Sequence, residues 1–262
     1  MDNRPIGVMD SGLGGLSVVR VLRQELPEES VIFVGDEGHF PYGTKSQDEI
    51  KRFVVRIGQF LEDQDAKLMV IACNTATAAA LTTVQKELTI PVIGVIHPGA
   101  VAASKNAKER VGIIATESTT SDGAYVRELN QLAPTLQVIS KATQPLVSIV
   151  EHGKTGKPEA QETVHEQLAI FKDNPVDTLI LGCTHFPFLS AEIEKELGKN
   201  VTLIDPALET VEEVKSLLTE NDQLSNKPAT VNLYSTGNRN DLLNGVEKWL
   251  DGKYDKCDSL EL

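Results

Sequence analysis

Two cysteines stand in similar surroundings along the chain, and such surroundings can turn a thiol into a base. Each follows a short apolar run and precedes an amide or hydroxyl side chain and a stretch with helical spacing. The two segments read Ala72-Cys73-Asn74-Thr75 and Gly182-Cys183-Thr184-His185. A thiol at the N-terminus of a helix has a lowered pKa because the helix dipole stabilises the thiolate. Either cysteine alone is explained at least as well as a small buried apolar residue, whereas two in equivalent settings favour function.

A pair of thiols suits the inversion of a carbon that carries an acidic hydrogen. One thiolate removes the proton from one face, the other thiol returns a proton to the opposite face, and the roles are exchanged in the reverse direction. Asp10 and His185 are candidates for moving protons to and from the sulfurs. A metal site is not expected, because the sequence has no Cys-x-x-Cys and no two of its five histidines have helical ligand spacing.

A glycine-rich turn at Asp10–Ser17 is a candidate anion site. It follows a strand pattern and opens a helical one, so its backbone N–H groups can bind an anion. The dinucleotide-binding pattern is not met, because Ser17 stands where the third glycine is required. A plain capped turn explains this segment about equally well, and Phe40–Gly43 is by itself more often a plain turn than a ligand contact.

The elements that must position these residues alternate between strands and helices. Short runs rich in β-branched residues are separated by helix-length amphipathic segments, which is typical of βαβ units with parallel strands. The predicted strands are 6–9, 31–34, 68–72, 92–95, 111–114, 137–139, 178–181, 201–204 and 231–234. The predicted helices are 16–25, 47–62, 76–87, 124–131, 158–171, 189–197, 210–218 and 242–250.

A faint internal repeat accompanies this alternation. Ser11 and Thr116 each follow a strand and are 105 residues apart, and Cys73 and Cys183 are 110 residues apart. Two similar α/β halves would produce these offsets, with a ligand between them at the carboxyl ends of the strands. The repeat is weak by itself, because any α/β protein contains many junctions between a strand and a polar turn.

Composition excludes several classes of partner. The 262 residues include 25 Lys and Arg against 38 Asp and Glu, for a net charge of −13, which argues against nucleic acid and against an anionic membrane surface. No apolar run approaches 18 residues, and the first residues lack the basic region and apolar core of a signal peptide. The cysteines are three and far apart, so reduced thiols in the cytoplasm are expected, with Cys257 an incidental thiol in a polar tail.

Four motifs, in order and with family-like spacing, resemble the signature of bacterial glutamate racemases. They are Asp10-Ser-Gly-Leu-Gly-Gly-Leu-Ser17, Pro41-Tyr42-Gly43, Cys73-Asn74-Thr75-Ala76 and Gly182-Cys183-Thr184-His185-Phe186-Pro187. The likeness extends to Val111–Thr116, Gly123-Ala124-Tyr125 and Glu151, so it covers nearly the whole chain. It implies an isomerase that interconverts L- and D-glutamate without a cofactor and supplies D-glutamate for peptidoglycan.

The resemblance also implies a fold and roles for individual residues. The fold would be two similar three-layer α/β domains with largely parallel sheets facing each other across a cleft, residues 1–97 with 208–262 and residues 98–207. Cys73 would exchange the proton with D-glutamate, assisted by Asp10, and Cys183 with L-glutamate, assisted by His185 and Glu151. The expected substrate contacts are Asp10, Ser11, Tyr42, Gly43, Asn74, Thr75, Thr116, Thr119, Thr184 and His185.

Other interpretations stay open at this point. A related racemase of aspartate or a hydantoin would share the paired thiols, and a periplasmic-type binding module would share two α/β halves. A pyridoxal-phosphate racemase is disfavoured because none of the quoted motifs contains a lysine. His97, His152 and Pro206 depart from residues frequent in the family, and whether the chain forms a homodimer stays undecided.

Overall fold

The chain forms two compact units in the computed structural model, which describes residues 1–262 except the side chain of Lys248. The first unit comprises residues 1–95 and 207–262, and the second comprises residues 96–206. The boundaries predicted from the sequence lie within two residues of these. The second unit is therefore an insertion in the first, which is built from both ends of the chain.

The first unit contains a six-stranded sheet. Its strands are β1 (Ile6–Asp10), β2 (Val31–Gly35), β3 (Leu68–Ile71), β4 (Val92–Gly94), β9 (Val231–Ser235) and β10 (Lys256–Ser259). They lie in the order β10-β9-β2-β1-β3-β4, and every neighbouring pair is parallel. Strands β1, β2 and β3 are buried along their whole length, as expected when helices cover both faces of a sheet.

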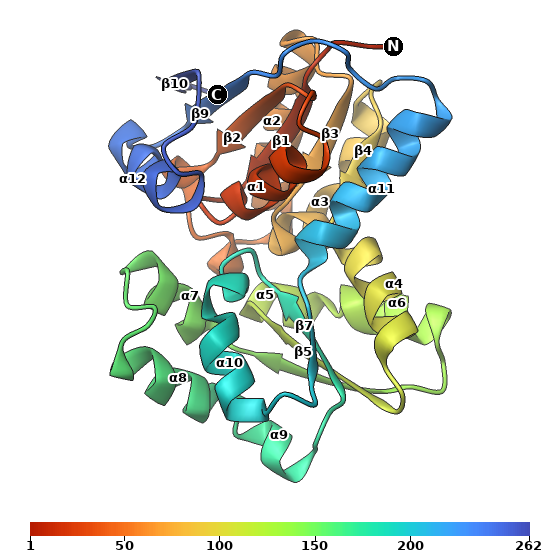
Figure 1. Cartoon of the computed structure of the whole chain (residues 1–262), viewed down its shortest axis with the longest axis vertical. Helices are drawn as coiled ribbons and strands as arrows, with labels where there is room; N and C mark the ends of the chain where they lie inside the picture. The colour runs from red at the N-terminus through yellow and green to blue at the C-terminus, as the bar shows by residue number, and fades with distance from the viewer. The chain divides into compact units, whose positions relative to one another are not determined.

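Helices cover both faces of this sheet (Figure 1). On one face lie α1 (Leu16–Glu25), α11 (Pro206–Glu220) and α12 (Arg239–Trp249), and on the other α2 (Gln47–Asp63) and α3 (Asn74–Glu87). Alternate strand residues such as Met9 and Ile71 pack against Ile57 and Leu61 of α2 and Ala80 of α3. Two short 3₁₀ turns, η1 (Glu37–His39) and η2 (Tyr42–Thr44), follow β2.

The second unit contains a four-stranded parallel sheet. Its strands β5 (Arg110–Ala115), β6 (Gln137–Ala142), β7 (Thr178–Gly182) and β8 (Thr202–Ile204) lie in the order β6-β5-β7-β8. On one side lie α4 (Ile96–Asn106) and α6 (Ala124–Leu132), and on the other α7 (Gln144–Glu151), α8 (Pro158–Leu168) and α10 (Ser190–Leu197) (Figure 1). The remaining elements are α5 (Glu117–Asp122), α9 (Ile170–Asp173) and η3 (Phe186–Leu189). The predicted class, two α/β domains with parallel sheets, is confirmed.

The two sheets share a topology. In the first unit β1 lies between β2 and β3, and in the second β5 lies between β6 and β7, so the strand order reverses beside β1 and beside β5. Ligands of open α/β sheets bind outside the carboxyl ends of the strands at such a reversal. Ser11 and Cys73 follow β1 and β3, while Thr116 and Cys183 follow β5 and β7. The internal repeat thus corresponds to equivalent positions in the two sheets.

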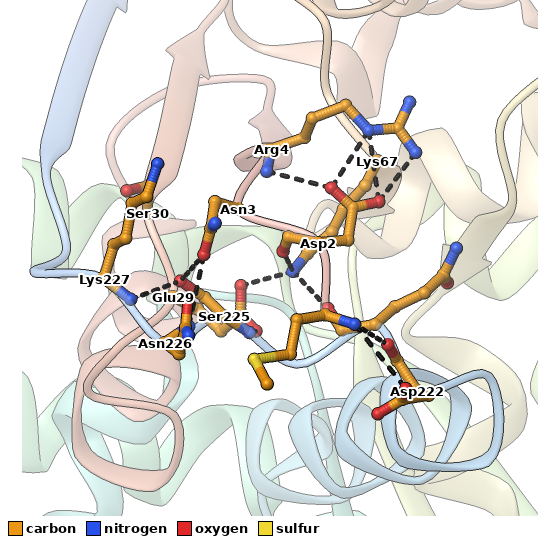
Figure 2. A network of polar contacts seen from close by, with 12 residues as sticks. Asp2, Asn3, Arg4, Glu29, Ser30, Lys67, Asp222, Ser225, Asn226 and Lys227 are labelled. Atoms are coloured by element: carbon orange, nitrogen blue, oxygen red, sulfur yellow. Dashed lines mark hydrogen bonds and ion pairs between the residues drawn. The ribbon is translucent and has the colours of Figure 1, made fainter.

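A buried ion pair lies at the opposite, amino-terminal ends of the strands of the first sheet (Figure 2). Lys67 precedes β3, and its Nζ lies 2.6 Å from Oε2 of Glu29, with neither side chain more than 2% exposed. The same ammonium donates to the carbonyls of Asp2 and Gln223, each at 2.8 Å. Oε1 of Glu29 accepts from the N–H of Ser225 at 2.8 Å. The pair therefore ties the N-terminal segment to the segment between α11 and β9.

The sequence missed some elements and misjudged one. Helices α4, α5 and α7 and strand β10 were not predicted. The placement of Cys257 in a polar tail was wrong, because Cys257 lies in β10, pairs in register with Leu233 and is buried. No helix in the described part of the chain is both long enough and apolar enough to span a membrane.

Candidate functional site

The first unit gathers one set of the predicted site residues at the carboxyl ends of β1 and β3. Asp10 ends β1, is fully buried and accepts the N–H of Gly12 at 3.2 Å on Oδ2. The thiol of Cys73 lies 3.5 Å from the hydroxyl oxygen of Ser11. We call this set, with Tyr42, Gly43, Asn74 and Thr75, the first half-site.

Cys73 caps the helix that follows it. Its sulfur accepts the N–H of Ala76 at 3.4 Å, so α3 begins at Asn74, two residues earlier than the sequence predicted. Asn74 and Thr75 occupy the first turn of α3, and both are buried. Because the N-terminal end of a helix carries partial positive charge, this position favours a thiolate on Cys73 and an anionic group beside it.

Tyr42 lies in the same buried cluster as Cys73, and its hydroxyl is committed to a carboxylate. The phenol donates a short hydrogen bond to Oδ2 of Asp36, the residue that directly follows β2. Burial, together with the charge of Asp36, raises the pKa of Tyr42 above its usual range, so the phenol stays neutral and keeps its proton. Gly43 follows Tyr42 in the η2 turn, and the peptide bond between Phe40 and Pro41 is cis.

The second half-site, in the second unit, is a thiol–imidazole–carboxylate chain. Cys183 directly follows β7, and its sulfur lies 3.5 Å from Nδ1 of His185. Nε2 of His185 makes a short hydrogen bond to Oε1 of Glu151, the last residue of α7. Burial of His185 disfavours its charge, but the hydrogen bonds to Cys183 and Glu151 outweigh it and raise the pKa of the imidazole well above its usual range.

Hydroxyl side chains complete the second half-site. Thr116 follows β5 and caps α5, its Oγ1 accepting the N–H of Thr119 at 3.3 Å and lying 3.0 Å from Oγ1 of Thr119. Thr184 stands between Cys183 and His185 and is buried. These hydroxyls and the first N–H groups of α5 can bind the oxygens of a carboxylate.

The two thiols are less alike than the sequence suggested. Cys73 caps an α-helix directly, whereas Cys183 precedes the 3₁₀ turn η3, and α10 begins only at Ser190. The prediction that both cysteines face the N-terminus of a helix therefore holds for Cys73 alone. Cys183 has the imidazole of His185 beside it instead.

Four polar residues beside the first half-site were missed by sequence reasoning: Asp36, Glu37, Ser235 and Thr236. Thr236 Oγ1 donates to Asp36 Oδ1 at 2.5 Å, and Ser235 makes a short hydrogen bond to Glu37. Burial, together with the charges of Asp10 and Asp36, raises the pKa of Glu37 to about 8. Asp36 and Thr236 directly follow β2 and β9, but the contact between them arises only when these two strands pair.

The three departures from frequent family residues lie in the second unit. Nδ1 of His97 is 2.8 Å from Oε2 of Glu128, and the ring of His152, directly after α7, contacts Ser148 of that helix. Pro206 starts α11, where its missing N–H costs nothing. Among the described residues no group of three or more His, Cys, Asp or Glu side chains could hold a metal ion.

Comparisons of the sequence and of the structure with known proteins both find racemases. The model of the Asp/Glu/Hydantoin racemase family matches residues 6–214. The glutamate racemase of Limosilactobacillus reuteri is 60% identical over all of this chain and 98% of its own length. Among solved structures, a glutamate racemase isoform of Bacillus anthracis superposes with a TM-score of 0.96 at 38% identity, over 100% of this chain and 99% of that one.

A second solved structure, of the glutamate racemase of Francisella tularensis in complex with D-glutamate, has a TM-score of 0.93 at 37% identity, over 100% of this chain and 98% of that one. These likenesses span the full chain, and they confirm the resemblance drawn from the four motifs. They also make the protein an isomerase of the racemase type. The chain belongs to the Asp/Glu/Hydantoin racemase family and, within it, groups with the glutamate racemases.

Proposed function

We propose that the protein interconverts L- and D-glutamate without a cofactor, with Cys73 and Cys183 as the two bases. The observation that carries the proposal is the placement of each thiol at the carboxyl end of the equivalent strand of its own sheet, β3 and β7, beside the reversal of strand order. The substrate follows from the relatives, which are named glutamate racemases.

The proposed reaction moves one proton off the substrate and another onto it. With L-glutamate, the Cys183 thiolate takes the Cα hydrogen as a proton, so the Cα–H bond breaks, an S–H bond forms and the electron pair passes into the α-carboxylate. The Cys73 thiol then gives its proton to the opposite face of Cα and becomes a thiolate. D-glutamate runs through the same steps in reverse, with the roles of the sulfurs exchanged.

Neighbouring groups would restore the protonation states of the two thiols between turnovers. The protonated His185, hydrogen-bonded to Cys183 and backed by Glu151, stabilises the Cys183 thiolate and can return a proton to it. Asp10 would assist Cys73 by exchanging a proton with its sulfur. The substrate's carboxylates would be held by hydroxyl, amide and backbone N–H groups of both half-sites: Ser11, Tyr42, Gly43, Asn74, Thr75, Thr116, Thr119 and Thr184.

The product points to a biological role. D-glutamate is a component of peptidoglycan, and we propose that this enzyme supplies it for cell-wall synthesis. A reducing cytoplasm suits the mechanism, because two thiols must stay unoxidised through every turnover.

Proton exchange in D₂O tests the two-base mechanism directly. The unaltered protein should racemise either enantiomer and place deuterium at Cα of the product. Cys183→Ala should lose racemisation by at least about a hundredfold, yet still exchange the Cα hydrogen of D-glutamate with retention of configuration, because only Cys73 remains. Cys73→Ala should do the same with L-glutamate alone. NMR of Cα deuteration with chiral chromatography separates these outcomes.

Cys257→Ala is the matched control, since it removes the third thiol without touching either half-site, and its rate should equal that of the unaltered protein. Racemisation at the native rate by either site variant would rule out the two-base assignment. If a panel of substrates showed turnover of aspartate or a hydantoin in preference to glutamate, the proposed substrate would be wrong, but the two-base mechanism would stand.

A further inference from the structure

Asp36 is a buried carboxylate that joins three side chains beside the first half-site. It is 1% exposed and directly follows β2. Oδ2 accepts the hydroxyl of Tyr42, while Oδ1 is 2.9 Å from Nδ1 of His39 and accepts the hydroxyl of Thr236 at 2.5 Å. A buried carboxylate is tolerated only when its oxygens are hydrogen-bonded, so each of these partners supports the others.

Thr236 reaches this cluster from the far end of the chain. It follows β9, and its backbone N–H donates to the carbonyl of Gly35 at 3.1 Å. Its Oγ1 donates to Asp36 and also accepts the N–H of Gly38 at 3.1 Å, so one hydroxyl fixes both the carboxylate and the η1 turn. The hydroxyl thereby uses its one proton and an acceptor site at once.

Glycines allow the two segments to approach this closely. A Cβ on Gly38 would lie 2.7 Å from the carbonyl oxygen of Thr236, and a Cβ on Gly237 would lie 2.9 Å from the N atom of Gly38. Backbone therefore packs directly on backbone between the exits of β2 and β9. The two segments are in close van der Waals contact, so a shift of Thr236 must move the η1 turn with it.

We infer that Thr236 is a positioning residue for substrate binding, acting through Asp36 on Tyr42 and the η2 turn. The inference rests on the proposed function, which makes Tyr42 and Gly43 substrate contacts. Thr236 itself touches neither sulfur in the described contacts; its hydroxyl fixes the carboxylate to which the buried phenol of Tyr42 is anchored. The C-terminal segment of the chain thus helps to build the first half-site.

Loss of the Thr236 hydroxyl should weaken substrate binding more than it slows the chemistry. Asp36 would lose a charge-assisted hydrogen bond and the η1 turn would lose its tether, so the η2 turn would hold the substrate less well. Neither turn carries a thiol, so proton transfer at Cα would be little changed. An interaction made equally in the ground state and the transition state appears in KM rather than kcat.

The experiment compares Thr236→Val, Thr236→Ser and Thr219→Val. Thr236→Val should raise KM for glutamate by roughly tenfold, with kcat within about twofold of the unaltered enzyme. Thr236→Ser keeps the hydroxyl and should return KM to within about twofold. Thr219→Val removes an exposed hydroxyl that donates to Lys215 O at 2.6 Å on α11, and should change nothing. If Thr236→Val fails to fold, the smaller Thr236→Ala takes its place.

A double-mutant cycle with Tyr42→Phe separates positioning from general stability. Because both changes cut the same chain of contacts, Thr236→Val in the Tyr42→Phe background should add less than about twofold to KM. Multiplication of the two effects, an unchanged KM in folded Thr236→Val, or an equally impaired Thr236→Ser would each overturn the inference. A lowered melting temperature with unchanged KM would do so as well.

Failure of the proposed function would look different. It would appear in the unaltered enzyme, as absence of glutamate racemisation with turnover of another amino acid. The ratio of KM values between Thr236→Val and the unaltered enzyme, measured on that amino acid, would then decide the inference by the same criteria.

Discussion

The partners of the two thiols differ in kind. Cys183 has an imidazolium backed by a carboxylate, whereas Cys73 has a serine hydroxyl and a backbone N–H. The two enantiomers of glutamate have equal free energies, so kcat/KM must be the same in both directions whatever the residues are. Any difference in kcat between the two enantiomers must therefore be matched by a difference in KM of the same factor.

Glu37 supplies a pH dependence of stability at the level of one residue. Burial raises its pKa to about 8 from an ordinary value near 4.5, so the folded state holds a proton that the unfolded chain releases. Stability from this group is complete below the unfolded pKa and is lost as the pH rises through the folded pKa. Glu37→Gln, which cannot ionise, should stabilise the protein increasingly from pH 5 to pH 8, by at most about 1.4 kcal/mol per pH unit.

Urea denaturation across this range measures the difference between Glu37→Gln and the unaltered protein. Glu220→Gln, an exposed change at the end of α11, should give a flat difference. A difference for Glu37→Gln that is equally flat would show that Glu37 ionises normally in the folded state.

Sequence reasoning named the candidate residues that carry recognisable chemistry. Cys73 and Cys183 stood out because a thiol after a strand and before a helix is unusual, and His185 because it lies two residues from a thiol. Asp36 and Thr236 did not, because they are 200 residues apart and their importance arises only when β9 pairs with β2. A long-range pairing of strands is the information that local pattern lacks.

At the scale of elements, the ion pair of Lys67 and Glu29 predicts a stability effect without a catalytic one. Lys67→Met leaves Glu29 buried without its cation and two carbonyls without a donor, so the free energy of unfolding should fall by about 3–5 kcal/mol. The pair lies at the amino-terminal ends of the strands of the first sheet, away from Cys73 at their carboxyl ends, so kcat and KM of the folded protein should not change.

Denaturation with urea, together with kinetics at a temperature where the variant is folded, checks this. Lys51→Met is the matched control, since Lys51 pairs with the exposed Asp48 at 3.3 Å, and its cost should stay below about 1 kcal/mol. A Lys67→Met protein as stable as the control would mean that the buried pair contributes nothing.

Local patterns predicted some elements and missed others. Helix α1 was predicted with its observed bounds, because its valines and leucines recur with helical spacing. Helix α4 was missed because it contains Pro98 and Gly99, yet both fall in its first turn, where a proline is tolerated. Strand β10 has one apolar residue, Cys257, and it forms because its backbone pairs with the free side of β9.

At the scale of the whole molecule, the net charge of −13 bears on how substrate is captured. Glutamate is itself an anion, and the half-sites offer it local dipoles and N–H groups rather than lysine or arginine. Long-range attraction is therefore absent, and kcat/KM should not rise when salt is lowered from about 200 to about 20 mM. Measurement of kcat/KM at fixed pH across this range checks it; a steep rise at low salt would indicate an unrecognised cationic path.

The insertion of the second unit into the first has a consequence for synthesis on the ribosome. Strand β2 cannot pair on its outer side until β9 is made, about 200 residues later. At 5–20 residues per second the nascent chain carries that open strand edge for roughly 10–40 s. An apolar edge exposed for so long invites contact with other chains. Chaperone demand during translation should therefore peak while the second unit is being made, and should end once residue 235 has left the exit tunnel.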